Sequence, residues 1–268
     1  KIIEKTATET GIVALDDVSE LPHDITVQLT GENVGGKEVT VCGKNLFIPM
    51  EKSETQVGVT VSYDKTDHTF VFNGTSTSSF SFEMVPNGGK YIPVRKGDTF
   101  TLSTEVISGT TNNHPSVYIN DTFTKSPYIS ATVSNSTTKT YEGDGHIYRM
   151  ALSVRAAGAT YDNYKVKVML EIGDRVTKFE PYIERQTYTA NADGKVDEIK
   201  SISPNMTFMC DGVDMSVDYH KSYGMQTEYD RFWDEFQKNG ARRTYTYAFY
   251  GSAWTDKNYN PKYPLIVT

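Results

Sequence analysis

Cysteine and tryptophan are scarce in this chain, with two of each among 268 residues. Cys42 and Cys210 lie far apart in the sequence, and neither has a second cysteine or a histidine at the spacing of a zinc site. We therefore favour two small buried thiols over a disulfide, and we expect no zinc centre.

Long apolar runs and an excess of positive charge are also missing. No run approaches the roughly 18 apolar residues of a membrane-spanning helix. Lys and Arg total 27 against 34 Asp and Glu, which gives a formal net charge of −7. Phosphate binding requires a basic stripe that releases counterions. We therefore expect neither a membrane span nor a nucleic-acid partner.

Catalytic motifs are absent as well, because no His-x-x-x-His, Gly-x-Ser-x-Gly or phosphate-loop pattern occurs. Two carboxylates facing each other could supply the acid and base of a glycosidase, and the candidate pairs are Glu83 with Glu105 and Asp162 with Glu171. Solvated acids at sheet edges are the favoured interpretation, so we expect no enzyme. Solvated rings are expected for the five histidines, His23, His68, His114, His146 and His220, which lie in or beside turn-like or polar segments.

Alternation of apolar and polar residues is the strongest pattern that is present. Val59 to Tyr63 and Thr69 to Thr75 alternate on either side of a turn, which predicts a β-hairpin. Further strands follow at roughly the 8–12-residue spacing of a sandwich. They are predicted at 79–85, 99–107, 116–119, 128–133, 145–154 and 164–171. The fold class is therefore all-β, with a jelly-roll-like antiparallel β-sandwich over residues 43–182.

Shorter segments flank this sandwich. Residues 1–42 read as a β-arm or linker, and residues 183–222 as a small β-subdomain. In residues 223–268 a short helix is predicted from Met225 to Lys238, followed by an aromatic-rich stretch. A first residue Lys1 without an initiating methionine indicates a piece of a longer protein or a processed product.

Aromatic residues are abundant, with 18 Tyr and 12 Phe. A shallow sugar site needs an aromatic platform beside a few hydrogen-bonding side chains, and such side chains gather in or beside the predicted strands. The candidate carbohydrate-binding residues are Tyr118, Asn120, Tyr128, Tyr148, Arg149 and Tyr161. The alternative is that these tyrosines are packing residues of the core or of sheet edges.

A structural calcium ion is the remaining cofactor hypothesis, since jelly-roll sandwiches often hold one through carboxylate and carbonyl oxygens. Asp98, Asp144, Asp162 and Asp174 are candidates by residue type alone. The sequence assigns no metal site and no other cofactor.

Three stretches of the sequence carry a family resemblance. They are residues 4–23 followed by Gly43-Lys44-Asn45-Leu46-Phe47, then residues 169–182, and then 232–234 with 248–251 and 254–256. Together they resemble phrases of tail or minor structural proteins of phages and prophages of Firmicutes. In those proteins the second phrase closes a carbohydrate-binding-module-like sandwich, and the third leads into leucine-rich surface repeats, which this chain does not reach.

The resemblance implies a virion protein of the distal tail or baseplate that touches the host envelope. Its implied partners are other tail proteins, further copies in a trimer, and a host cell-wall or capsule polysaccharide. Leu46 and Phe47 would enter the core, and Pro181-Tyr182 would end the last strand. Two alternatives stay open: an architectural spacer, and a bacterial surface adhesin or glycoside-hydrolase accessory domain.

Overall fold

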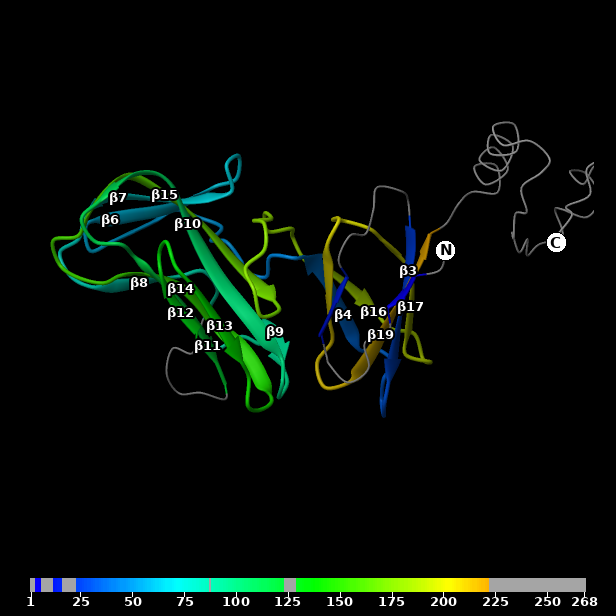
Figure 1. The fold of residues 1–268 in the computed structure, drawn as a ribbon. Helices are drawn as coiled ribbons and strands as arrows, with labels where there is room; N and C mark the ends of the chain where they lie inside the picture. The colour runs from blue at the N-terminus through cyan, green and yellow to red at the C-terminus, as the bar shows by residue number, and fades with distance from the viewer. Residues whose placement is uncertain (1–2, 6–11, 16–22, 87, 123–128, 222–268) are drawn as a thin grey trace, which may run out of the picture. The chain divides into compact units, whose positions relative to one another are not determined.

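The computed structural model describes residues 3–5, 12–15, 23–86, 88–122 and 129–221. Every regular element in these ranges is a β-strand (Figure 1), so the all-β prediction is confirmed. Over the same ranges, no helix has the length and apolar character needed to cross a membrane. The helix predicted from Met225 to Lys238 lies outside the described residues.

Strands β5 to β15 form a large antiparallel sandwich. One sheet has the order β13-β10-β15-β7-β6-β5, and its strands are β5 (Glu54–Gln56), β6 (Val59–Asp64), β7 (Thr69–Thr75), β10 (Thr99–Thr111), β13 (Ser136–Thr140) and β15 (Thr160–Ile172). The other has the order β12-β11-β14-β8, with β9 also pairing with β14, and its strands are β8 (Phe80–Glu83), β9 (Ile92–Val94), β11 (Ser116–Asp121), β12 (Ile129–Thr132) and β14 (Gly145–Val154). The chain passes repeatedly between the two sheets, as in a jelly roll, which confirms the predicted sandwich.

Alternation along the strands builds the core of this sandwich. Val59 and Val61 of β6 are buried, as are Phe70 and Phe72 of β7, because residues two apart on a strand face the same side of the sheet. The Phe70 ring meets Phe47 edge to face, with centroids 5.7 Å apart. Edge-to-face pairs of this kind stabilise the core beyond the contribution of the apolar area that the rings bury.

Of the predictions for the two phrases that border the large sandwich, one is confirmed and the other is wrong. Leu46 and Phe47 are buried, so the prediction that they enter the core is confirmed. The prediction that Pro181-Tyr182 ends the last strand is wrong, because β15 stops at Ile172. Gly173 follows with a φ of 124°, a conformation that favours glycine, and the chain leaves the sheet there.

The flanking segments together form a small sandwich with its own core. One sheet has the order β1-β19-β3-β17, with β1 (Ile3–Lys5), β3 (His23–Thr30), β17 (Lys195–Lys200) and β19 (Asp214–Lys221). The other has the order β16-β4-β18-β2, with β2 (Ile12–Leu15), β4 (Glu38–Gly43), β16 (Gln186–Thr189) and β18 (Met206–Met209). Strands from residues 1–42 and 183–222, which look like separate segments in the sequence, therefore pair with each other.

Strand β18 is buried on both of its faces. Met206 and Phe208 belong to the core of the small sandwich, whereas Met209 belongs to the core of the large one. Cys42 of β4 joins Met209 in the large core. Cys42 and Cys210 are both buried and free, as the sequence predicted. The strands of the small sandwich thus contribute side chains to both cores.

Candidate functional site

The outward side of the five-stranded sheet carries mainly polar and small side chains. Phe82, Val117 and Leu152 are aligned in register and buried inside the sandwich, so their neighbours along each strand point to the opposite side. We call this outward surface the polar face; it comprises Ser81, Glu83, Ser116, Tyr118, Asn120, Ser130, Thr132, Arg149, Ala151 and Ser153.

Tyr118 stands among small side chains on the polar face. It is half-buried and lies opposite Ala151 of β14 and Ser130 of β12. One step further along the face, Ser116 lies opposite Ser153. A tyrosine ring with short neighbours presents an apolar surface and a polar tip, which is the element that stacks against a sugar ring.

Asn120 and Arg149 lie opposite each other on β11 and β14, and the register shifts directly after this pair. This irregularity places two residues, Tyr148 and Arg149, between the inward-facing Ile147 and Met150. A bulge of this kind redirects side chains and interrupts the ladder locally. It brings Tyr148, Arg149 and Asn120 to one end of the polar face.

Arg149 makes a bidentate ion pair with Glu83 of β8. Its Nε lies 2.9 and 2.8 Å from the two carboxylate oxygens, and its Nη2 also donates to Oε1. The hydrogen bonds to Glu83 raise the pKa of Arg149, and the electrostatic effect of the Tyr148 phenol acts in the same direction. The guanidinium is therefore fixed in place, since a fork of this kind holds both partners in one orientation.

Asn120 is only 5% exposed, and its Oδ1 is buried without a hydrogen-bond partner. Buried side-chain oxygens are nearly always bonded, because an unpaired one costs about 1–3 kcal/mol. Asn45, which is also buried, accepts hydrogen bonds from two backbone N–H groups through its Oδ1. The core hydroxyls of Thr69 and Tyr161 are also buried without a partner, so the unpaired oxygen of Asn120 is relevant to ligand binding because it lies beside Tyr118 and Arg149.

The structure brings four of the six candidate sugar-binding residues together. Tyr118, Asn120, Tyr148 and Arg149 gather on β11 and β14. Tyr161 belongs to the core instead, where it is 4% exposed and its ring centroid lies 5.4 Å from that of Phe72. Burial raises the pKa of Tyr161 to about 12. Tyr128 lies outside the described residues.

Glu83 is the member of this group that the sequence did not suggest as a sugar ligand. Alternation along β8 places it on the opposite side from Phe82, but only the pairing of β8 with β14 brings it to Arg149. The glycosidase pairs are separated. Glu83 and Glu105 lie on different sheets, and Asp162 and Glu171 lie towards opposite ends of the long strand β15.

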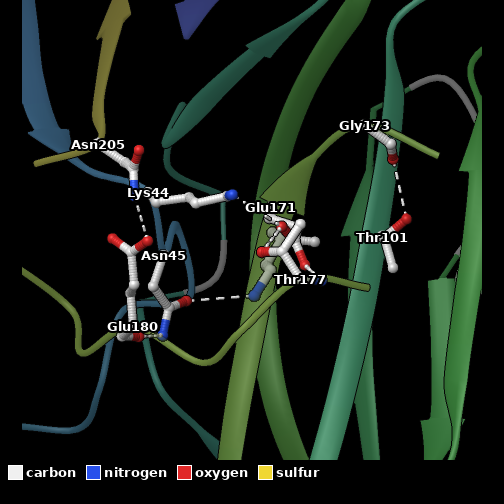
Figure 2. Close-up of polar contacts among 9 residues, drawn as sticks. Lys44, Asn45, Thr101, Glu171, Gly173, Thr177, Glu180 and Asn205 are labelled. Atoms are coloured by element: carbon white, nitrogen blue, oxygen red, sulfur yellow. Dashed lines mark hydrogen bonds and ion pairs between the residues drawn. The ribbon is translucent and has the colours of Figure 1, made fainter. Parts of the chain in front are cut away.

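A second polar cluster lies where the chain leaves β15, and its centre is the buried carboxylate of Glu171 (Figure 2). Glu171 is 0% exposed and accepts hydrogen bonds from the backbone N and Oγ1 of Thr177, at 3.0 and 2.6 Å. The Lys44 ammonium lies 3.6 Å away. A buried charge requires such partners, so Glu171 has a structural reason to be where it is.

The same cluster fixes the segment that follows β15. Thr101 Oγ1 donates to the carbonyl of Gly173 at 2.9 Å, and Asn205 of the small sandwich donates to the carboxylate of Glu180. Asn45 Nδ2 donates to the backbone oxygen of Glu180 at 3.1 Å (Figure 2). These polar residues of the closing phrase thus anchor the chain across the sandwich.

The turn between β18 and β19 is held by basic side chains of the large sandwich. Arg95 Nη1 lies 2.6 Å from Asp214 Oδ1. His146 Nε2 lies 2.9 Å from Asp211 Oδ1, in a contact without the alignment of a hydrogen bond. A cavity of about 350 Å³ opens beside this turn. A second cavity, of about 250 Å³, is lined in part by Lys44.

Two histidines bear on the expectation of solvated rings. The side chain of His146 is only 15% exposed because it packs against Asp211. His114 Nδ1 lies 2.6 Å from the hydroxyl of Tyr164 in a partly buried contact. For His146 the expectation is wrong, since tertiary packing covers a segment that is polar in sequence, whereas His114 is exposed as expected and makes this one contact.

Metal ligation was a hypothesis based on residue type. In the ranges that the structure describes, no three His, Cys, Asp or Glu side chains come together as ligands of a metal ion would. Asp98 and Asp144 each accept a backbone N–H, at 2.8 and 2.9 Å, in the turn between β9 and β10. Asp162 and Asp174 are exposed elsewhere in the sandwich. The four candidates therefore do not converge on one cage.

Comparison with known proteins adds little. No family model matches the sequence, and no curated protein matches it significantly. A structure of the infectious bursal disease virus Gx strain is 9% identical, with 82% of this chain and 72% of that chain covered and a TM-score of 0.17. T=1 particles derived from infectious bursal virus are 8% identical, with 82% and 71% covered and a TM-score of 0.16. At such scores neither similarity bears on fold or function.

Proposed function

We propose that this chain is a structural component of a phage tail or baseplate and that its large sandwich binds a host-surface glycan through the polar face. The observation that carries the binding proposal is the position of Tyr118 among short side chains, beside the fixed Arg149–Glu83 pair. A sugar ring can stack on the phenol while its hydroxyls reach the polar groups around it.

The virion half of the proposal is supported by the sequence phrases that resemble phage tail proteins of Firmicutes. Two of those phrases have clear structural roles here. Leu46 and Phe47 fill the core, and Glu171 holds Thr177 as the chain leaves β15. Other tail proteins, and further copies of this chain in a trimer, are the partners that we propose on the same ground.

An architectural spacer is the second candidate function. It is favoured by the double burial of β18, whose side chains enter both cores, and by the Arg95–Asp214 contact. These features suit a rigid connector between subunits.

The binding proposal is tested by displaying the full chain in many copies on a glycan array and on host cell walls. A shallow site of this kind gives millimolar to micromolar affinity for one copy, so many copies are needed for detectable retention. Tyr118→Ala should abolish retention. The control is Tyr63→Ala, which removes another half-buried tyrosine, but from β6 of the other sheet.

Retention that is lost in the Tyr118 variant and kept in the Tyr63 variant supports the polar face as the site. Equal loss in both variants points to general destabilisation. A complete absence of retention in the wild-type chain, at any valency and on any cell wall, contradicts glycan binding and leaves the spacer function.

A further inference from the structure

At the Asn120 end of the polar face, the charge of Arg149 is already balanced within the protein. Arg149 uses Nε and Nη2 for Glu83, and the side chains of the two residues are 23% and 37% exposed. An approaching anion therefore meets a guanidinium and a carboxylate together. The attraction to one is offset by repulsion from the other, since both lie at similar distances.

A further cation of the polar face is displaced from this pair. Arg155 follows strand β14 directly, six residues beyond Arg149, which corresponds to about 20 Å along an extended chain. Its Nη1 lies 3.3 Å from Thr132 Oγ1. Charges so far apart are screened at physiological ionic strength, where the Debye length is about 8 Å. The contact with Thr132 places Arg155 at the other end of the polar face, so it does not make the Asn120–Arg149 end basic.

The hydrogen-bonding capacity of Asn120 gives a second, independent reason to expect an uncharged ligand. Asn120 Oδ1 is a buried acceptor with no partner, so its ligand must donate a hydrogen. A phosphate or carboxylate oxygen cannot donate, whereas a sugar hydroxyl both donates and accepts. The terminal amide of asparagine rotates easily about χ2, which allows Oδ1 to turn towards a ligand on the face.

Arg149 supplies the complementary donor. Its Nη1 takes no part in the contacts with Glu83. Residues directly opposite on antiparallel strands have Cβ atoms about 5 Å apart, and Asn120 and Arg149 are such a pair. One hydroxyl can thus donate to Asn120 while a neighbouring hydroxyl accepts from Arg149.

We propose that the polar face selects an uncharged saccharide with adjacent free hydroxyls and discriminates against anionic polymers, an inference that rests on the proposed glycan binding. The unit over Tyr118 is a neutral ring, recognised by one acceptor and one donor of the protein. A phosphate or carboxylate group supplies no donor to Asn120 and gains no net attraction from the paired charges of Arg149 and Glu83, so an anionic group over this site is disfavoured.

The test compares the full chain with two neutral probes, dextran and mannan, and two anionic probes, hyaluronan and poly(glycerol phosphate), by titration calorimetry at low and physiological salt. The wild-type chain should bind at least one neutral probe at least tenfold more tightly than either anionic probe. Asn120→Ala should weaken that binding about fivefold to tenfold, the effect of one neutral hydrogen bond.

Glu83→Gln provides the sharper comparison because it releases the charge of Arg149. This variant should gain at least fivefold affinity for the anionic probes at low salt and lose the gain at high salt. The control is Glu105→Gln, which changes the net charge equally but from an exposed position on β10 of the other sheet. It should leave all four affinities unchanged.

The outcomes separate the two proposals. Tighter wild-type binding to an anionic probe overturns the selectivity but retains glycan binding. Equal gains for Glu83→Gln and Glu105→Gln also overturn it, because the effect is then one of net charge. If none of the four probes binds the wild-type chain, the selectivity falls together with the evidence for a glycan site on this face.

Discussion

Replacing Asn45 and Asn120, the asparagines that are buried in the described part of the chain, by alanine should have very unequal consequences for stability. Asn45 and Asn120 are 2% and 5% exposed, so truncation to alanine removes a buried amide group at both positions. Asn45 makes four hydrogen bonds, with the backbone of Val168 and Glu180 as acceptors and the backbone N–H groups of Phe47 and Leu170 as donors. The Oδ1 of Asn120 makes none.

The expected loss of stability depends on how many buried polar groups each variant leaves without a hydrogen-bond partner. Asn45→Ala strands several buried backbone groups, each at about 1–3 kcal/mol, for a total loss of about 3–5 kcal/mol. Asn120→Ala removes an acceptor that is already unsatisfied, so its stability should stay within about 1 kcal/mol of the wild type. For a chain of this size 1 kcal/mol corresponds to about 2–4 °C in Tm. Asn45→Ala should therefore lower Tm by roughly 10 °C.

Scanning calorimetry of the full-length variants at neutral pH measures both shifts. The reasoning is refuted if Asn120→Ala lowers Tm as much as Asn45→Ala does. In that case Asn120 is a structural residue, and its unpaired oxygen no longer points to a ligand. A Tm equal to or above that of the wild type is the signature of a group kept for binding at the expense of stability.

Two further predictions concern the interior. Glu171→Gln should lower the free energy of unfolding by about 2–4 kcal/mol in urea titrations, because it replaces charge-assisted bonds to Thr177 by weaker ones; a loss below 1 kcal/mol would show that the network is dispensable. Burial raises the pKa of the Cys42 thiol to about 11, so between about pH 9 and 11 the unfolded chain releases a proton that the folded chain keeps, and stability falls as pH rises, by up to about 3 kcal/mol. Cys42→Ala should make that fall shallower, and identical pH profiles of the two proteins would contradict this assignment.

Much of the strand pattern was predictable because alternation directly reports a half-buried surface. The strands of the β6–β7 hairpin and the long strands β10, β14 and β15 were all identified from alternation. β9 was missed because Ile92-Pro93-Val94 is short and contains a proline. β13 was missed because Ser136 to Thr140 is polar throughout and lies at the edge of its sheet.

The pairing of the flanking segments could not be predicted from local patterns. β4 lies between β16 and β18 in one sheet, although more than 140 residues separate it from them. Contacts between such distant segments depend on the closure of the whole sandwich between them, and no local propensity encodes them. The double burial of β18 is visible in the sequence only as a short run of apolar residues.

Part of the candidate site could also be predicted from the alternation of residues along a strand. Tyr118 and Asn120 are two residues apart on one strand, so alternation places them on the same face. Their proximity to Arg149 depends on strand pairing and on the bulge after Asn120. For Tyr161, a sugar-binding candidate in the sequence, the alternative of core packing holds, because a register shift between Tyr161 and Tyr164 turns both rings into the core.

The most direct test of glycan binding by the polar face is to map a bound glycan onto the full chain by NMR. With a neutral oligosaccharide that the array identifies, side-chain and amide signals of Tyr118, Asn120, Arg149 and Ala151 should shift together and saturate at one affinity. Signals of the six-stranded sheet and of the small sandwich should stay in place. Shifts confined to those other surfaces, or no saturable shift at Tyr118, would contradict the account.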